Sequence, residues 1–256
     1  IHASTIEDVK EGWRERARPG GSVIGIAGEF SVDGVQNRLE ELLSDWKGTT
    51  SEPTRLADPP RDYAHEEDTT NQVQIVLVHD APAEPHADSM LERVVTSVLS
   101  GGMSGRLFTE VREKRGLCYN VYAFASPFED HGLFGIYVAA AEDEIGEAMP
   151  VIVDETLSVA ERVGDEELRR SFAQLKAGLL MGLESTTARA ERLAQSLIIY
   201  GRAQSVRSAV AELEAVTPAQ VSALAARLPG AGAPTLAALG PIARVQDYQD
   251  LLRRFN

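Results

Sequence analysis

Two apolar segments separated by a six-residue loop require this chain to form a sheet with an antiparallel pair. Residues 119–126 (YNVYAFAS) and 133–140 (LFGIYVAA) have the length and the β-branched and aromatic content of strands, and residues 127–132 (PFEDHG) form a loop of hairpin type. A parallel connection needs a crossover of a dozen or more residues. The short loop therefore argues against a doubly wound parallel sheet.

Three more elements precede this hairpin. The spacing of apolar residues predicts a strand at 73–79 and helices at 88–99 and 104–115. Gly116 follows the last helix at the place where a left-handed residue is expected. The apolar side of the second helix contains three residues that we expect to be buried: Leu107, Phe108 and Val111.

After the hairpin, residues 143–228 are helical in pattern almost throughout, with one long segment at 165–200. Their alternation of apolar stripes and charges is typical of helices that lie over a sheet. We therefore expect an α+β fold, a two-layer sandwich in which a mixed, largely antiparallel sheet carries helices on one face.

The N-terminal part has an order of its own. Thr5 caps a first helix, residues 22–27 (SVIGIA) form a short buried strand, and Ser31 caps a second helix at 32–46. Residues 49–71 contain three prolines and many polar residues, which is typical of a linker.

The end of the chain repeats its beginning at an offset of 212 positions, without a gap. This shift places Thr5 on Thr217, Gly28 on Gly240 and Leu39 on Leu251, and the order of capped helix, strand, glycine and amphipathic helix recurs. We interpret residues 72–256 as one complete second domain, 49–71 as a linker, and 1–48 as the C-terminal remnant of a first copy. Such a duplication implies that roughly 140 residues of the first copy are absent.

Charge and apolar content restrict the partners. With 25 Lys and Arg against 39 Asp and Glu, the formal net charge is −14, and no basic patch interrupts it. Nucleic acid and anionic membrane surfaces are therefore not expected as partners. No apolar run approaches 18 residues and the N-terminus lacks the pattern of a signal peptide, so we expect a soluble protein.

The single cysteine, Cys118, excludes an intrachain disulfide and a multi-thiolate metal site. A reducing compartment is compatible with this, and we expect a cytoplasmic location, with the periplasm as the alternative.

Residues 101–122 (GGMSGRLFTEVREKRGLCYNVY) strongly resemble the second, non-zinc domain of the insulinase, pitrilysin and mitochondrial-processing-peptidase family of zinc metallopeptidases, which are inverted zincins. The resemblance extends to the preceding strand and helix and to the following hairpin. Residues 18–46 look like the end of the family's first domain. The resemblance implies the family-type duplicated α+β fold.

In that family an inverted His-x-x-Glu-His helix and a downstream Glu hold zinc, leaving a fourth position for water. The histidines here are at positions 2, 65, 79, 86 and 131, and none begins this motif or its mirror image. We therefore expect no metal and no cofactor in this chain, no catalytic zinc ligand or base, and zinc in the complete enzyme.

Arg112 and Tyr119 match the arginine and tyrosine that the family's second domain directs at substrate. The resemblance implies that Arg112 donates to a peptide carbonyl and that the Tyr119 hydroxyl stabilises the oxyanion formed from the scissile carbonyl. The alternative is that Arg112 forms a helix ion pair with Glu110 or Glu113 and that Tyr119 is an ordinary strand aromatic.

For the other candidate site residues, a structural role is expected. Residues 101–104 lack the Gly-Lys-Ser/Thr of a phosphate loop and are expected to form a turn between helices. His79 and His86, beside Asp80 and Asp88, are expected to be surface residues rather than metal ligands. Cys118 is expected to be a small buried residue rather than a nucleophile.

The carboxylate pairs Glu66-Glu67 and Glu166-Glu167 are expected to be solvated faces and helix starts, not a glycosidase site.

Two function classes remain. The first is the substrate-clamping C-terminal part of a zinc metalloendopeptidase that acts on peptides or unfolded segments and is not catalytic alone. The second is a non-catalytic binding or structural subunit of the same fold. Either class implies a missing N-terminal half or a zinc-carrying partner chain, and a homo- or heterodimer.

Overall fold

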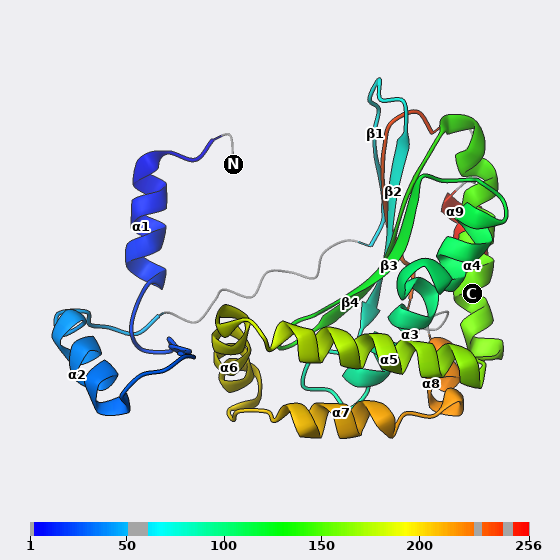
Figure 1. Cartoon of the computed structure of the whole chain (residues 1–256). Coiled ribbons are helices and arrows are strands. Elements are labelled where there is room, and N and C mark those ends of the chain that lie inside the picture. Colours follow the sequence, from blue (N-terminus) through cyan, green and yellow to red (C-terminus); the bar gives the residue numbers. More distant parts are fainter. Residues whose placement is uncertain (1–2, 51–60, 228–231, 243–247, 256) are drawn as a thin grey trace. The chain divides into compact units, whose positions relative to one another are not determined.

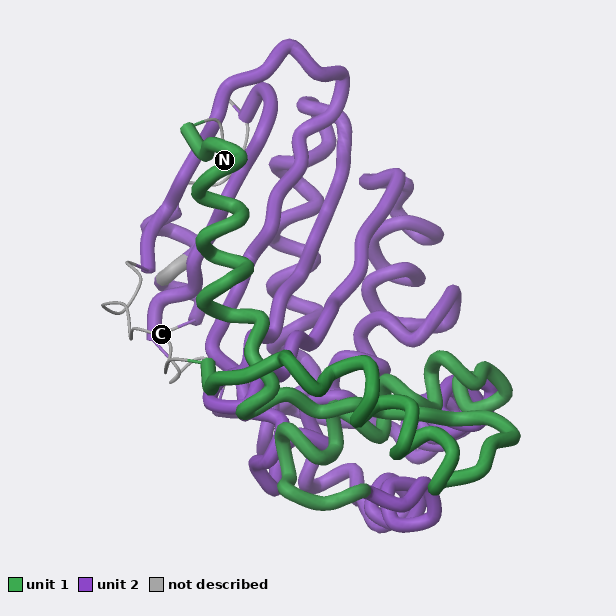
Figure 2. Tube along the Cα trace, turned by 90° about the vertical axis from the view of Figure 1, so that its left-hand side faces the viewer, with its two compact units in different colours: residues 1–59, 182–203 green, residues 60–181, 204–256 purple. Residues whose placement is uncertain are grey.

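The structure is a computed structural model that describes residues 3–50, 61–227, 232–242 and 248–255. The chain divides into two compact units, which Figure 2 colours separately. Unit 1 comprises Ile1–Pro59 and Gly182–Ala203, and unit 2 comprises Pro60–Met181 and Gln204–Asn256.

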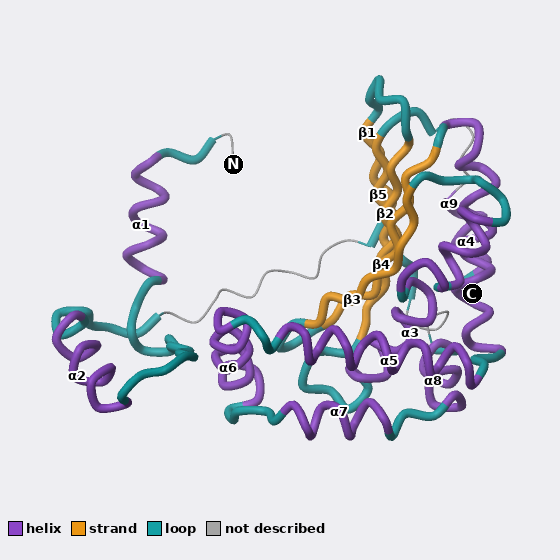
Figure 3. Tube along the Cα trace, in the orientation of Figure 1, coloured by secondary structure: helices purple, strands orange, loops and turns teal. Residues whose placement is uncertain are grey.

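Unit 2 contains a five-stranded sheet in the order β1-β5-β2-β4-β3 (Figures 1 and 3). Only β1 and β5 pair in parallel, and the other neighbours are antiparallel. The strands are β1 (Tyr63–Glu66), β2 (Val73–Ala81), β3 (Asn120–Pro127), β4 (Gly132–Ala140) and β5 (Thr235–Leu239). The mixed, largely antiparallel sheet predicted from the sequence is confirmed, because β3 and β4 form the expected hairpin.

The helices of unit 2 lie on one face of this sheet and along one of its ends (Figure 3). They are α3 (Ser89–Ser100), α4 (Glu142–Glu161), α5 (Asp165–Gly182), α7 (Val206–Glu214), α8 (Pro218–Ala225) and α9 (Tyr248–Arg254). A short 3₁₀ helix η1 (Gly102–Ser104) and a π-helix η2 (Phe108–Glu113) connect α3 to β3. This arrangement is the predicted two-layer α+β sandwich.

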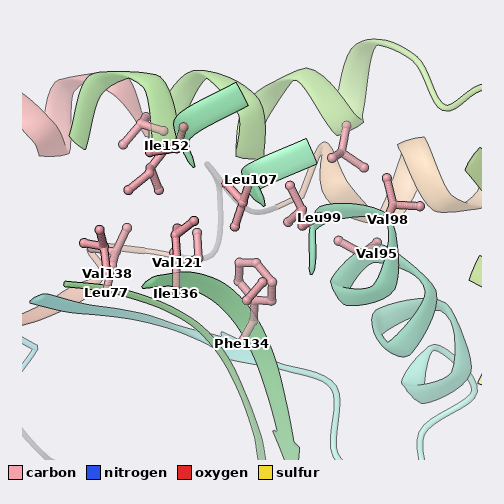
Figure 4. Packing of buried hydrophobic residues seen from close by; sticks show 14 of the residues in the cluster. Leu77, Val95, Val98, Leu99, Leu107, Val121, Phe134, Ile136, Val138 and Ile152 are labelled. Carbon is pink, nitrogen blue, oxygen red and sulfur yellow. The ribbon is translucent and has the colours of Figure 1, made fainter. Parts of the chain in front are cut away.

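The core lies between that face and the helices. Alternate residues of β2 are buried, as expected for a strand with one covered face. Figure 4 shows side chains from β2 and β4 pointing toward side chains from α3, α4 and the start of η2. The best-enclosed of these include Leu77, Phe134, Ile136, Leu99, Leu107 and Ile152.

The described residues of unit 1 form three helices: α1 (Ile6–Arg16), α2 (Val32–Leu42) and α6 (Thr186–Tyr200). Thr5 and Ser31 are the N-caps of α1 and α2, as predicted. No residue of α1 or α2 is buried among those described.

The strand predicted at residues 22–27 is not observed. The segment has no strand partner among the described residues and is a loop. It approaches α6 so closely that a Cβ on Gly25 would lie 2.1 Å from the carbonyl oxygen of Ala190. A strand needs neighbours for its N–H and C=O groups, and an apolar sequence alone does not provide them.

Two other boundaries differ from prediction. The helix expected at 165–200 is two helices, because residues 183–185 form a turn and the Ser185 side chain accepts from Ala188 N–H to cap α6. The segment expected to be linker contains β1, which pairs with β5 and thereby extends the sheet. Residues 51–60 of that segment lie outside the described residues.

Some local features of the structure recur at the offset of 212 positions predicted for the repeat. Thr5 and Thr217 each form a capping box at the start of α1 and α8. Gly28 and Gly240 both have positive φ, of 146° and 103°. The domain boundaries drawn from this repeat stay a prediction.

His79 is a core residue, so its predicted place on the surface is wrong. It lies at an inward-facing position of β2, is 3% exposed, and its ring meets Phe255 edge-on at 4.7 Å. Burial lowers the pKa of His79 to about 4, with smaller and opposing effects from Asp80 and Arg61. The imidazole is therefore neutral near pH 7, which is compatible with an apolar environment.

We expect His79 to make the fold sensitive to acid. Unfolding exposes an imidazole with an ordinary pKa of 6.5, so between pH 6.5 and about 4 the unfolded state binds more protons and the free energy of unfolding falls. Across this range the wild type should lose about 3 kcal/mol more than His79→Leu. Urea unfolding at pH 7 and pH 4 measures this. The exposed His131→Gln is the control, and equal losses in wild type and His79→Leu would contradict the assignment.

Candidate functional site

The turn between η2 and β3 places Arg112 next to Tyr119. Gly116, with φ of +68°, ends the helical segment, as predicted. The N–H groups of Gly116 and Leu117 donate to the carbonyl oxygens of Arg112 and Val111 at 2.9 and 3.0 Å. Tyr119 N–H then donates to Ala139 of β4 at 3.1 Å, so the chain enters the sheet at once.

The Arg112 guanidinium contacts two aromatic rings. Its Cζ lies 4.8 Å from the ring centroid of Phe108 and 5.6 Å from that of Tyr119. Phe108 is one helical turn earlier on η2, and Tyr119 is 73% exposed. These three residues form the candidate site, and the aromatic rings hold the guanidinium by cation–π attraction while its edge keeps N–H donors for a ligand.

The π-helical geometry contributes to this arrangement. In η2 the Lys114 N–H donates to Thr109, five residues earlier, at 3.0 Å. The helix predicted at 104–115 is therefore observed, but its main part, 108–113, is π-helical. π-Helical turns are rare and occur frequently at functional sites.

Glu110 does not neutralise Arg112. Its carboxylate accepts from Lys114 at 2.5 Å and from Arg115 at 3.0 Å, and hydrogen bonding to Lys114 is the main cause of its lowered pKa. In the described part of the chain Arg112 has no ion pair. The alternative in which Arg112 forms a helix ion pair with Glu110 or Glu113 is therefore wrong.

Phe108 is the member of the site that the sequence did not reveal. We predicted it to be buried with Leu107 and Val111, and those two are fully buried, but Phe108 is only half-buried. Its position four residues before Arg112 is the signal that could have identified it, because such residues share one helix face.

Cys118 is a structural residue, as predicted. It is buried, and burial raises the pKa of its thiol to about 11, although the nearby Arg112 charge opposes this. A thiol with so little thiolate at neutral pH is a poor nucleophile.

Residues 101–104 form the predicted turn between helical elements, and Gly105 N–H donates to Gly102 at 3.1 Å. Glu167 lies in the first turn of α5, as predicted for a helix start, but its carboxylate is not fully solvated, because it accepts from Arg106 at 2.8 Å in a half-buried ion pair that connects α5 to the residues just before η2. Hydrogen bonding to Arg106 is the main cause of the lowered pKa of Glu167. Glu166, its neighbour, is exposed and pairs with Arg170.

The described residues do not fit a zinc site. They contain no group of three or more His, Cys, Asp or Glu side chains that could hold a metal ion. Three histidines have polar neighbours of their own: His65 (Gly240 carbonyl, 2.9 Å), His86 (Asp88 N–H, 3.0 Å) and His131 (Asp130 carboxylate, 2.6 Å). His2 lies outside the described residues.

Comparison with known sequences supports the resemblance drawn above. Residues 4–175 match the family model described as the peptidase M16 inactive domain. An uncharacterized zinc protease of Streptomyces coelicolor is 30% identical over 94% of this chain and 55% of its own length. One of Bacillus subtilis, YmxG, is 29% identical over 80% of this chain and 51% of its own length. The chain thus spans about half the length of these relatives.

Solved structures share the fold. A protease from Helicobacter pylori superposes with a TM-score of 0.79 at 18% identity, covering 94% of this chain and 60% of its own. A peptidase M16 inactive domain from Pseudomonas fluorescens gives 0.76 at 19% identity, with 96% and 60% covered. A chain of complex III2 from Candida albicans gives 0.78 at 18% identity, with 89% and 57% covered.

We expect the contacts of Arg112 with Tyr119 to contribute little to folding. Arg112→Met and Tyr119→Ala should each lower the free energy of unfolding by about 1 kcal/mol or less, because cation–π contacts at exposed sites are weak. Urea unfolding of both single variants and the double variant measures this and the coupling between the residues. Leu107→Ala, at a fully buried position, is the control and should cost about 2–5 kcal/mol. Losses above about 3 kcal/mol at Arg112 and Tyr119 would make them structural residues.

Proposed function

The chain belongs to the M16 peptidase family, of which it carries the inactive domain, and from this premise we propose that it clamps peptide substrate for a zinc-dependent metalloendopeptidase. One observation carries the proposal. Arg112 lies between Phe108 and Tyr119 without an ion pair in the described part of the chain, and the phenol beside it is exposed. The substrates would be peptides or unfolded protein segments.

The two side chains would have different tasks. The planar donors of Arg112 would bind a backbone carbonyl of the substrate, and the stacked rings would restrict the guanidinium to one orientation. The hydroxyl of Tyr119 would donate to the scissile carbonyl oxygen as it becomes an oxyanion. Loss of one such donor typically lowers the rate by about 10²- to 10³-fold.

The catalytic metal would come from outside this chain. Because the described residues do not fit a zinc site, we assign no step of the reaction to a metal held here. The names of the relatives include zinc protease, and the chain spans about half their length. We therefore infer that zinc is bound by a missing N-terminal half or by a partner chain.

The surface of α1 supports such a partner. Ile6, Val9 and Trp13 lie on one side of the helix at spacings of three and four residues, and all three are well exposed, Trp13 by 73%. An apolar helix face of this kind normally packs against more protein. A second copy or a different chain could supply it, giving a homo- or heterodimer.

Among the described residues no helix is long and apolar enough to cross a membrane. A cytoplasmic location stays part of the proposal, with the periplasm as the alternative.

Kinetics of the complete, active protein test the clamp. Tyr119→Phe should lower kcat by about 10²-fold with a smaller effect on KM, because the hydroxyl acts on charge that develops in the transition state. Arg112→Ala should also weaken peptide binding. Tyr122→Phe, three residues further along on β3, is the matched control and should leave kcat within about twofold. Unchanged kinetics in both site variants would refute the clamp.

A non-catalytic subunit is the second candidate, because the fold also matches a chain of complex III2 from Candida albicans. Both candidates predict that this chain alone neither holds stoichiometric zinc nor cleaves peptides. Peptidase activity of the complete protein, measured with and without a chelator, separates them. Only the clamp candidate predicts activity there that the chelator removes.

A further inference from the structure

A cavity of about 200 Å³ lies in unit 2 between the end of β2, α3 and the end of α8. Its walls are mainly apolar and include Ala81, Pro82, Val95 and Leu224. It has no residue in common with the Arg112, Phe108 and Tyr119 site. The exposed side chains of Asp80 and Arg227 also line it, so the cavity opens to solvent on their side.

Glu92 of α3 contributes a buried carboxylate to this cavity. The residue is only 7% exposed, and its Oε1 is fully buried without a hydrogen-bond partner among the described residues. Carboxylates are rarely buried unless they are paired, because an isolated ionised carboxylate loses its hydration without compensation. An unpaired oxygen at the wall of a cavity therefore requires an explanation.

The cations near Glu92 are engaged elsewhere. Arg227 donates to Asp88 at 2.5 Å, and Arg93, one residue after Glu92, donates to Glu84. Arg61 pairs with Asp80 at the outer end of β2. The protein thus provides a carboxylate in an apolar cavity and no ion pair for it in the described part of the chain.

We propose that this cavity binds a primary alkylammonium ion such as the end of a lysine side chain, with its nitrogen at Glu92 and its methylene groups against the apolar walls. The charge requires a cation, and the apolar walls favour one with an alkyl stem. A metal ion would need further ligands, and the described residues contain no group of three. At about 30 Å³ per water molecule, the cavity of about 200 Å³ has the volume of about seven waters, enough for the five non-hydrogen atoms of n-butylammonium.

The affinity of this cavity for an alkylammonium ion should depend on pH. Burial raises the pKa of Glu92 to about 7, and the positive charge of Arg227 opposes this. A cation favours the ionised carboxylate, so the affinity should rise by about tenfold between pH 6 and pH 8 as Glu92 loses its proton. Asp80 on β2 and Arg227 after α8 also line the cavity, Asp88 before α3 pairs with Arg227, and Arg61 pairs with Asp80. His86 lies 3.7 Å from Asp88, so a His86 variant is the control for this pH dependence.

NMR titration of the chain with n-butylammonium chloride at constant ionic strength tests the proposal. Saturable shifts should appear at amides of β2, α3 and α8, and n-butanol, which has the same shape without the charge, should bind at least tenfold more weakly. Glu92→Gln should weaken n-butylammonium by at least tenfold at pH 8 and abolish the pH dependence. His86→Gln should retain the pH dependence.

Two further variants distinguish binding inside this cavity from a general electrostatic attraction of the cation to the acidic surface. Asp80→Asn removes an exposed charge at the opening of the cavity and should change the affinity by less than about threefold. Ala81→Leu should fill the cavity and remove binding with Glu92 intact, which tests the proposal even if Glu92→Gln does not fold. An equal loss in Asp80→Asn and Glu92→Gln, or no saturable binding in the wild type, would overturn it.

The source of the amine follows from a second titration, with acetyl-Gly-Lys-Gly-amide and its norleucine analogue. Binding of the lysine peptide alone supports a polypeptide side chain as the ligand. Binding of n-butylammonium without the peptide supports a small free amine in the same site. Amine binding is independent of the clamp. Tyr119→Phe should leave amine binding by the chain unchanged, while it changes peptide hydrolysis by the complete protein.

Discussion

The packing of α3 and α4 on the inner face of β2 and β4 is the constraint on which the rest of unit 2 depends. Leu77 and Phe134 from the sheet meet Leu99 and Ile152 from the helices in a fully enclosed core. Once α3 is anchored there, the chain has only η1 and η2 with which to return to the sheet as β3. The geometry of the Arg112, Phe108 and Tyr119 site results from that short return. The positions of its side chains therefore depend on a rigid core rather than on each other.

The buried charged groups of unit 2 differ in whether they have a partner. Arg106 and Glu167 pair with good geometry, and the hydroxyl of Ser158 also accepts from Arg106, so their burial leaves few groups unsatisfied. Glu92 has no such partner for its Oε1 in the described residues. A satisfied pair connects two elements and stabilises their arrangement, whereas an unsatisfied carboxylate destabilises the fold when it is ionised. Natural proteins retain such destabilising groups mainly at functional sites, which is why Glu92 suggests a ligand.

The candidate site illustrates how a weak contact can have a functional consequence. Cation–π attraction between Arg112 and its two rings contributes little to stability at a site that solvent still reaches. It nevertheless limits the orientations of a long, flexible side chain before any ligand arrives. Less conformational entropy is then lost on binding, so the same hydrogen bonds yield a higher affinity. The π-helical segment, in which Phe108 and Arg112 share a face, provides this preorganisation.

The sequence by itself determined the local structure and the family. The hairpin, the N-caps such as Thr5 and the left-handed Gly116 depend on neighbouring residues, and all of them were predicted, although the loop between β3 and β4 is 128–131 rather than 127–132. The pairing of segments distant in sequence was decided only by the tertiary structure. Residues 22–27 are as apolar as a strand but have no partner strand among the described residues, whereas β1 lies in a segment with linker composition and still pairs with β5. Likewise, His79 and Glu92 carry no sign of burial in their own sequence. The dielectric environment of a side chain is set by residues that the fold brings from elsewhere in the chain, and local sequence does not contain that information.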